Sequence, residues 1–115
     1  MKYAVERAIE IDRDFAAIFD FLIESYQAFG EGPKVAIERA ATRLRSIETA
    51  MLSLGKAPPQ GTLRVELLPG QRSVTKNRAI FYFDVDDDRR VVRVLAVLFG
   101  GRDHQRHMLK RLLGG

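Results

Sequence analysis

The chain has 115 residues, a length that fits a single domain with one hydrophobic core. It contains no cysteine, which excludes disulfide bonds, thiolate metal sites and a cysteine nucleophile. Its 19 Lys and Arg against 15 Asp and Glu give a formal charge of +4, an excess too small to assign a nucleic acid or an acidic protein as partner. No signal peptide and no apolar run of about 18 residues is recognisable, so we expect a cytoplasmic protein without membrane contact.

A short strand is expected within residues 2–11, where apolar and polar side chains alternate loosely. The helix that follows has Asp12 or Asp14 as its expected N-cap and ends at Gly30. Its core-facing stripe consists of apolar residues at spacings of three and four, namely Phe15, Ile18, Phe19, Leu22, Tyr26 and Phe29.

A second helix is expected from Pro33, which follows Gly32, to the residue before Gly55. Its stripe consists of Ile37, Ala40, Leu44, Ile47, Met51 and Leu54. The short connection between the two helices predicts an antiparallel hairpin, whose apolar stripes need a surface to cover.

Two consecutive prolines within residues 56–61 exclude regular structure there and mark the change from helices to a sheet. Strands are then expected at 62–68 or 72–76, at 78–85 and at 90–99. Asp86, Asp87 and Asp88 form the expected turn between the last two strands. After Gly100 and Gly101 we expect a short tail helix with Asp103 as its cap and with Met108, Leu109, Leu112 and Leu113 on its apolar side.

This order predicts an α+β fold, with the helical hairpin packed on one face of a three- to four-stranded, mainly antiparallel sheet. Strict alternation places Ala79, Phe81, Phe83 and Val85 on one face of their strand. In the last strand it places Val92, Val94, Ala96 and Leu98 opposite Val91, Arg93, Leu95, Val97 and Phe99. Both faces of that strand are apolar, so some apolar sheet surface should stay exposed unless a partner covers it.

Three stretches together resemble the RelE/ParE toxin superfamily of type II toxin–antitoxin systems, and more narrowly its ParE branch. They are LLPGQRSV at residues 67–74, RAIFYFDVDDDRRVVRVLAVLFGGRD at 78–103 and RDFAAIFDFL at 13–22. The similarity covers nearly the whole chain. Two departures are that the histidine typical of the ParE strand ending is replaced around Leu98 and Phe99, and that the tail is longer than the shortest members need.

The resemblance implies a toxin held inactive by a ParD-like antitoxin, whose C-terminal segment wraps the groove and sheet of the toxin. ParE-like members inhibit DNA gyrase, whereas RelE-like members cut messenger RNA in the ribosomal A site. We expect a gyrase inhibitor. The alternatives are a ribosome-dependent endoribonuclease and a non-toxic antitoxin-binding module. No cofactor and no metal are expected, and direct nucleic-acid binding is expected only for the endoribonuclease.

RNA cleavage by a 2′-hydroxyl needs a base, an acid and a cation for the phosphate. The candidates for these roles are Tyr82, Arg78, Arg102, His104 and His107. The two histidines are three residues apart and can share one side of the tail helix, but no spacing brings a cluster of strand cations to them.

A gyrase inhibitor needs only a shaped basic surface. We expect its target contacts in the tail, at Arg102, Asp103, His104, Arg106 and His107. Antitoxin contacts are expected on the strands, at Arg72, Arg78, Tyr82, Arg93, Leu95 and Val97.

Overall fold

The computed structural model describes residues 2–56, 62–63 and 70–99. Two helices, α1 (Ile11–Ala28) and α2 (Pro33–Leu52), form a hairpin, and α2 continues into the short 3₁₀ turn η1 (Ser53–Gly55). Five strands form one sheet in the order β1-β5-β4-β3-β2. The strands are β1 (Ala4–Arg7), β2 (Thr62–Leu63), β3 (Arg72–Lys76), β4 (Ala79–Asp86) and β5 (Val91–Phe99).

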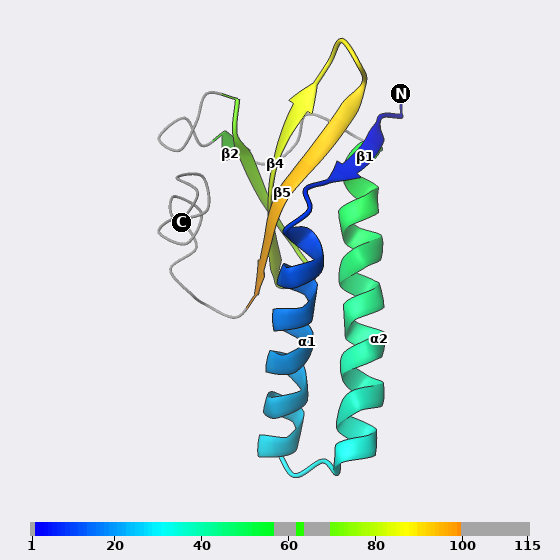
Figure 1. The fold of residues 1–115 in the computed structure, drawn as a ribbon, viewed down its shortest axis with the longest axis vertical. Helices are drawn as coiled ribbons and strands as arrows, with labels where there is room; N and C mark the ends of the chain where they lie inside the picture. Colours follow the sequence, from blue (N-terminus) through cyan, green and yellow to red (C-terminus); the bar gives the residue numbers. More distant parts are fainter. Residues whose placement is uncertain (1, 57–61, 64–69, 100–115) are drawn as a thin grey trace.

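β1 pairs parallel with β5, and the other neighbouring strands are antiparallel. The two helices lie side by side along the sheet, and their distal halves extend past the end of the strands (Figure 1). The predicted α+β fold, a helical hairpin on a mainly antiparallel sheet, is confirmed. The sheet has five strands because the two-residue β2 joins its edge. The expected tail helix lies outside the described residues.

The main core lies between the helical hairpin and the sheet. Residues of both predicted helical stripes supply one wall of it, namely Phe15, Ile18, Leu22, Ala40, Ile47 and Met51. The sheet supplies the other wall, with Phe81, Phe83, Val92 and Val94 fully buried. The stripes are exposed where they approach the α1–α2 connection, with Phe29 at 90% and Ile37 at 47%, because that part of the hairpin extends past the sheet (Figure 1).

Asp14 lies in the first turn of α1 but does not cap the helix. α1 begins directly after Glu10 without a capping side chain, so the expected cap at Asp12 or Asp14 is wrong. The Asp14 carboxylate instead accepts a hydrogen bond from the backbone N–H of Val97 at 3.0 Å, and Asp14 is only 6% exposed. β1 pairs with β5 only as far as Val94. Beyond that point Asp14 supplies a hydrogen-bond acceptor to the edge of β5 that β1 leaves unpaired.

A β-bulge interrupts the pairing of β4 with β5. Tyr82 pairs with Ala96 and Phe83 with Val94, which leaves Leu95 as an extra residue in β5. An extra residue exchanges the two faces of a strand from that point on, because side chains alternate with a period of two. The faces expected from strict alternation are therefore correct up to Val94 and wrong from Ala96 onward.

Beyond the bulge, Val97 and Phe99 belong to the core under the helices. Ala96 and Leu98 belong to a second cluster with Tyr82. Tyr82 is 4% exposed, and the other two members are buried as well. These three residues expose almost no apolar surface, whereas Ile80 and Leu95 beside them are only partly buried.

Gly55, the last residue of η1, lies against the start of the chain. Its carbonyl oxygen accepts a hydrogen bond from the backbone N–H of Tyr3 at 2.8 Å. A Cβ at this position would collide with the carbonyl oxygen of Tyr3, which is part of the backbone and cannot turn aside. The close approach of η1 to β1 therefore requires glycine.

Gly55→Ala is expected to lower the free energy of unfolding by about 2 kcal/mol, because the added methyl group pushes β1 away from η1. Urea denaturation measures the loss. Gly32→Ala is the control, since open space surrounds Gly32 and its φ is −70°. Equal losses in the two variants would show that crowding against Tyr3 is not the cause.

The connection from β3 to β4 is a two-residue turn with an unusual backbone. Asn77 and Arg78 have φ values of 53° and 64°, between the paired residues Lys76 and Ala79. Positive φ at both central positions is typical of a type I′ turn, in which asparagine and then glycine are favoured. Arginine at the second position costs free energy, because its Cβ crowds the backbone in the left-handed region.

Arg78→Gly is expected to raise the free energy of unfolding by about 1 kcal/mol, because it removes this crowding. Arg78→Ala is the matched variant, since it removes the same guanidinium but keeps the Cβ, and we expect no gain from it. Urea denaturation of both variants gives the comparison. A gain of the same size in both would place the effect in the charge and not in the backbone.

Candidate functional site

The expected target contacts Arg102, Asp103, His104, Arg106 and His107 lie outside the described residues, so they stay a prediction. Of the five residues named for RNA cleavage, the structure describes only Tyr82 and Arg78. Tyr82 is buried in the second cluster, and Arg78 is exposed in the turn before β4.

The six expected antitoxin contacts do not form one surface. Arg72 pairs with Phe83, and Arg93 pairs with Asp84, so these two arginines lie near the same end of the sheet. Arg78 follows the opposite end of β3. Leu95 is half-buried at the bulge, and Tyr82 is buried beside it. The side chain of Val97 packs under the helices, so its expected place on the face of Arg93 and Leu95 is wrong.

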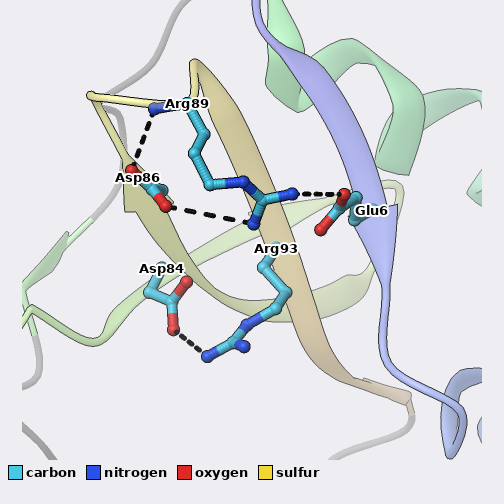
Figure 2. A network of polar contacts seen from close by, with 5 residues as sticks. All are labelled: Glu6, Asp84, Asp86, Arg89 and Arg93. Atoms are coloured by element: carbon cyan, nitrogen blue, oxygen red, sulfur yellow. Dashed lines mark hydrogen bonds and ion pairs between the residues drawn. The ribbon is translucent and has the colours of Figure 1, made fainter.

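A network of ion pairs lies around the hairpin between β4 and β5 (Figure 2). Arg89 links Glu6 of β1, at 3.1 Å, to Asp86 of β4, at 4.0 Å. Arg93 pairs with Asp84 at 3.2 Å. The side chains are largely exposed, so each pair stabilises the fold by at most about 1 kcal/mol. The network fastens β1 to the hairpin and gives Arg93 a partner inside the chain.

Tyr3 adds a second link between the start of the chain and this hairpin. Its hydroxyl group donates a hydrogen bond to Oδ1 of Asp87 at 2.7 Å. The hydrogen bond raises the pKa of the Tyr3 phenol, because the neutral phenol is the form that can donate it. Together with the backbone bond to Gly55, it holds Tyr3 from two sides.

The end of β5 lies against both helices. The ring of Phe99 meets that of Phe21 of α1 edge to face, with centroids 5.9 Å apart. The guanidinium carbon of Arg43 of α2 lies 5.8 Å from the centroid of the Phe99 ring. A cavity of about 60 Å³, here termed the Phe99 cavity, is lined by Ala17, Ile18 and Phe21 of α1 and by Val97, Leu98 and Phe99 of β5. Its lining is apolar apart from the Asp14 carboxylate, which already accepts the N–H of Val97.

Arg43 is held in place near the ring of Phe99. Its Nη2 donates to the carbonyl oxygen of Asn77 at 2.9 Å, and Nδ2 of Asn77 donates to the carbonyl oxygen of Ser46 at 3.2 Å. These bonds attach the β3–β4 turn to α2. Within residues 2–56, 62–63 and 70–99, no carboxylate pairs with Arg43, nor with Lys76 and Arg78 on either side of Asn77.

Arg39, one turn earlier in α2, differs from Arg43 in this respect. Its guanidinium carbon lies 4.5 Å from the centroid of the Tyr26 ring, and its Nη1 pairs with Glu31 at 2.5 Å. The charge of Arg39 is therefore balanced inside the chain. A shallow hollow of about 340 Å³ lies between the two arginines, Tyr26, Glu38 and Thr42.

The sequence did not single out Arg43 or Phe21. The available signal was Phe21, a large aromatic residue beside the predicted stripe of α1 rather than on it. Such a residue indicates a second contact surface on the same helix. Arg43 carries no comparable signal, because a helix-surface arginine is usually solvated.

Among the described residues, no three histidine or acidic side chains come together in a way that could hold a metal ion. Neither α1 nor α2 combines the length and the apolar character needed to cross a membrane.

Neither a family model nor a curated protein matches the sequence. Solved structures do match the fold. A chain of the chromosomal ParDE toxin–antitoxin system from P. aeruginosa superposes with a TM-score of 0.61 and 20% identity, covering 84% of this chain and 94% of that one. The chain has the RelE/ParE fold.

Two further RelE/ParE structures agree. A chain of the toxin–antitoxin complex RelBE2 from Mycobacterium tuberculosis has a TM-score of 0.55 and 21% identity, covering 89% of this chain and 95% of that one. A double arginine-to-alanine mutant of E. coli RelE in the free state has a TM-score of 0.60 and 12% identity, covering 98% and 99%. The resemblance inferred from the sequence is thus confirmed at the level of the fold.

Proposed function

We propose that this chain is the toxin of a type II toxin–antitoxin pair, that a ParD-like antitoxin neutralises it in the cytoplasm, and that it inhibits DNA gyrase. The fold is the observation that carries the first part. It matches chains of the ParDE and RelBE2 systems over 84% and 89% of this chain. Both are toxin–antitoxin systems by name, so an antitoxin is the first partner to test for a chain of this fold.

The burial of Tyr82 supports gyrase inhibition over RNA cleavage. A catalytic acid or base must come within hydrogen-bond reach of its substrate. Tyr82 is 4% exposed and packs against Ala96 and Leu98, so its ring is shielded from an RNA strand.

Exposed apolar side chains on the helical hairpin support a protein target. Phe21, Phe29, Val35 and Ile37 are all exposed, and the distal half of the hairpin extends past the sheet (Figure 1). Four exposed apolar side chains on one hairpin favour a protein contact. A gyrase inhibitor needs such a contact surface and no acid–base pair.

The test is a supercoiling assay with purified gyrase and this protein, run beside a translation reaction whose messenger RNA is mapped for cuts. We expect loss of supercoiling or trapped cleaved DNA, with intact message. Cut message with normal supercoiling would contradict gyrase inhibition and would make Tyr82, Arg78, Arg102 and the two histidines the first residues to replace. Neither effect, together with normal growth on expression, would identify a non-toxic antitoxin-binding module.

The antitoxin is tested separately, by co-expression with the reading frame that neighbours the gene for this chain. We expect the two proteins to purify together and growth to be restored. Growth arrest that persists beside an expressed neighbour would contradict the proposed pairing.

A further inference from the structure

The corner where β5, α2 and the β3–β4 turn meet combines positive charge with an apolar cavity. It consists of Arg43, Lys76, Arg78 and Phe99, and is here termed the Arg43 corner. The three cations have no carboxylate partner in the part of the chain that the structure describes. Charges left without a partner beside an apolar surface are free to meet those of another molecule.

Arg43 is arranged in advance for such a contact. Its bond to the carbonyl oxygen of Asn77 and the Phe99 ring hold the guanidinium in one place. Arginine has five N–H donors, and only one of them is used by Asn77. A carboxylate that binds the others therefore meets a side chain whose conformational entropy has already been lost.

Phe99, whose ring lies near Arg43, also lines the Phe99 cavity. Its volume of about 60 Å³ exceeds by several-fold the space that one water molecule needs, so it can take a small aliphatic group. Its lining is apolar apart from Asp14, whose carboxylate is already engaged. Phe99 lies near both Phe21 and Arg43. One ligand can therefore fill the cavity with one group and bind Arg43 with another.

These features distinguish between two classes of partner. A nucleic acid gains affinity from several phosphates, each neutralised by a cation, and has no aliphatic side chain to place in an apolar cavity. Arg39, the next cation along α2, is already neutralised by Glu31, and Glu38 adds a negative charge beside it. Three cations next to an apolar cavity therefore fit a peptide that carries an acidic and an aliphatic residue close together.

We infer that the Arg43 corner binds an acidic, amphipathic segment of the antitoxin, with a carboxylate on Arg43 and an aliphatic side chain in the Phe99 cavity. This inference rests on the proposed toxin function and adds the chemistry of the partner. It also moves the main antitoxin contact away from Tyr82, which is buried, and Arg93, which pairs with Asp84, and it keeps Val97 only as part of the cavity lining.

The experiment measures the dissociation constant of the antitoxin recovered by co-expression, using full-length wild-type protein and three charge reversals. Arg43→Glu is expected to weaken binding by about 30-fold or more, because it replaces attraction at a fixed contact by repulsion. Lys76→Glu tests the same corner at the half-buried last residue of β3 and is expected to weaken binding by about 5-fold.

Arg45→Glu is the matched control. Arg45 lies on the same helix and also lacks a carboxylate partner in the described residues, but it lines a different hollow with Phe15 and Phe19. We expect it to change binding less than about 3-fold. The thermal midpoint of each variant shows whether it is folded. If Arg43→Glu does not fold, Lys76→Glu still tests the corner.

Equal affinities for Arg43→Glu, Lys76→Glu and Arg45→Glu, with a wild-type complex that forms normally, would overturn the inference and leave the toxin function standing. A 12-nucleotide oligouridine is titrated in parallel. Binding of this RNA by the wild type that Arg43→Glu abolishes, with antitoxin affinity unchanged, would assign the corner to nucleic acid and overturn the inference. Absence of any wild-type complex would overturn both the inference and the proposed pairing.

Discussion

Phe81→Ala is expected to lower the free energy of unfolding by about 4 kcal/mol, because it removes most of an aromatic side chain from the middle of the core. Phe81 is 0% exposed and lies on β4 opposite Val97, in the cluster that also contains the buried residues of both helices. Small domains have a total stability of about 5–15 kcal/mol, so this one change removes a large share of it. Urea denaturation gives the value.

Two variants make this result specific. Phe81→Leu keeps much of the volume and is expected to cost about 1.5 kcal/mol, which remains measurable if the alanine variant does not fold. Phe29→Ala makes the same replacement at a side chain that is 90% exposed, and we expect a change below about 0.5 kcal/mol. Similar losses for Phe29→Ala and Phe81→Ala would contradict the position of the core.

Asp14→Ala is expected to lower the free energy of unfolding by about 3 kcal/mol. The backbone N–H of Val97 would then be buried without its acceptor, and a buried donor left alone costs more than the hydrogen bond itself contributes. Asp14→Asn keeps a side-chain oxygen in reach and is expected to cost about 1 kcal/mol. Hydrogen exchange at the amide of Val97 measures the effect locally, and it should become faster in the alanine variant.

Asp12→Ala is the control for Asp14→Ala, since Asp12 lies in the same turn of α1. Its carboxylate is exposed and pairs with Arg7 at 3.5 Å, so we expect a loss below about 0.5 kcal/mol. If Asp12→Ala and Asp14→Ala lower the free energy of unfolding equally, the loss comes from the general effect of a carboxylate near a helix N-terminus. The hydrogen bond to Val97 would then not explain it.

The helical hairpin could be predicted because its apolar residues follow only one period. Phe15, Ile18 and Leu22 in α1 and Ile47 and Met51 in α2 match spacings of three and four, and all five are buried. The exposed ends of the stripes could not be predicted, because the sequence does not say how far the hairpin extends past the sheet.

The faces of β5 could not be predicted for a different reason. Its sequence VVRVLAVLF is apolar at both odd and even positions, so a shift of one residue leaves the hydrophobic pattern almost unchanged. The bulge at Leu95 is such a shift, and only the pairing with β4 reveals it. A strand with strictly alternating polarity would have shown the break in its sequence.

The candidate site was only partly accessible to sequence reasoning. Arg78 stood out as a strand arginine, whereas the structure places it in the turn that Arg43 contacts. Arg43 and Arg45 look alike in the sequence, both being arginines on a helix surface. They differ only in what the fold brings to them, which is Asn77 and Phe99 for Arg43 and Phe15 and Phe19 for Arg45.

The links between β1 and the β4–β5 hairpin also bear on how the chain folds during its synthesis. Tyr3 and Asp87 are 84 residues apart in sequence, and Glu6 and Arg89 are 83 apart. Contacts of such high sequence separation form slowly, because a long loop must close before any of them contributes. The helical hairpin consists of more local contacts, so we expect it to form before the sheet. The N-terminal strand, in contrast, has nothing to pair with until β5 has emerged, so the sheet closes as a late event of synthesis.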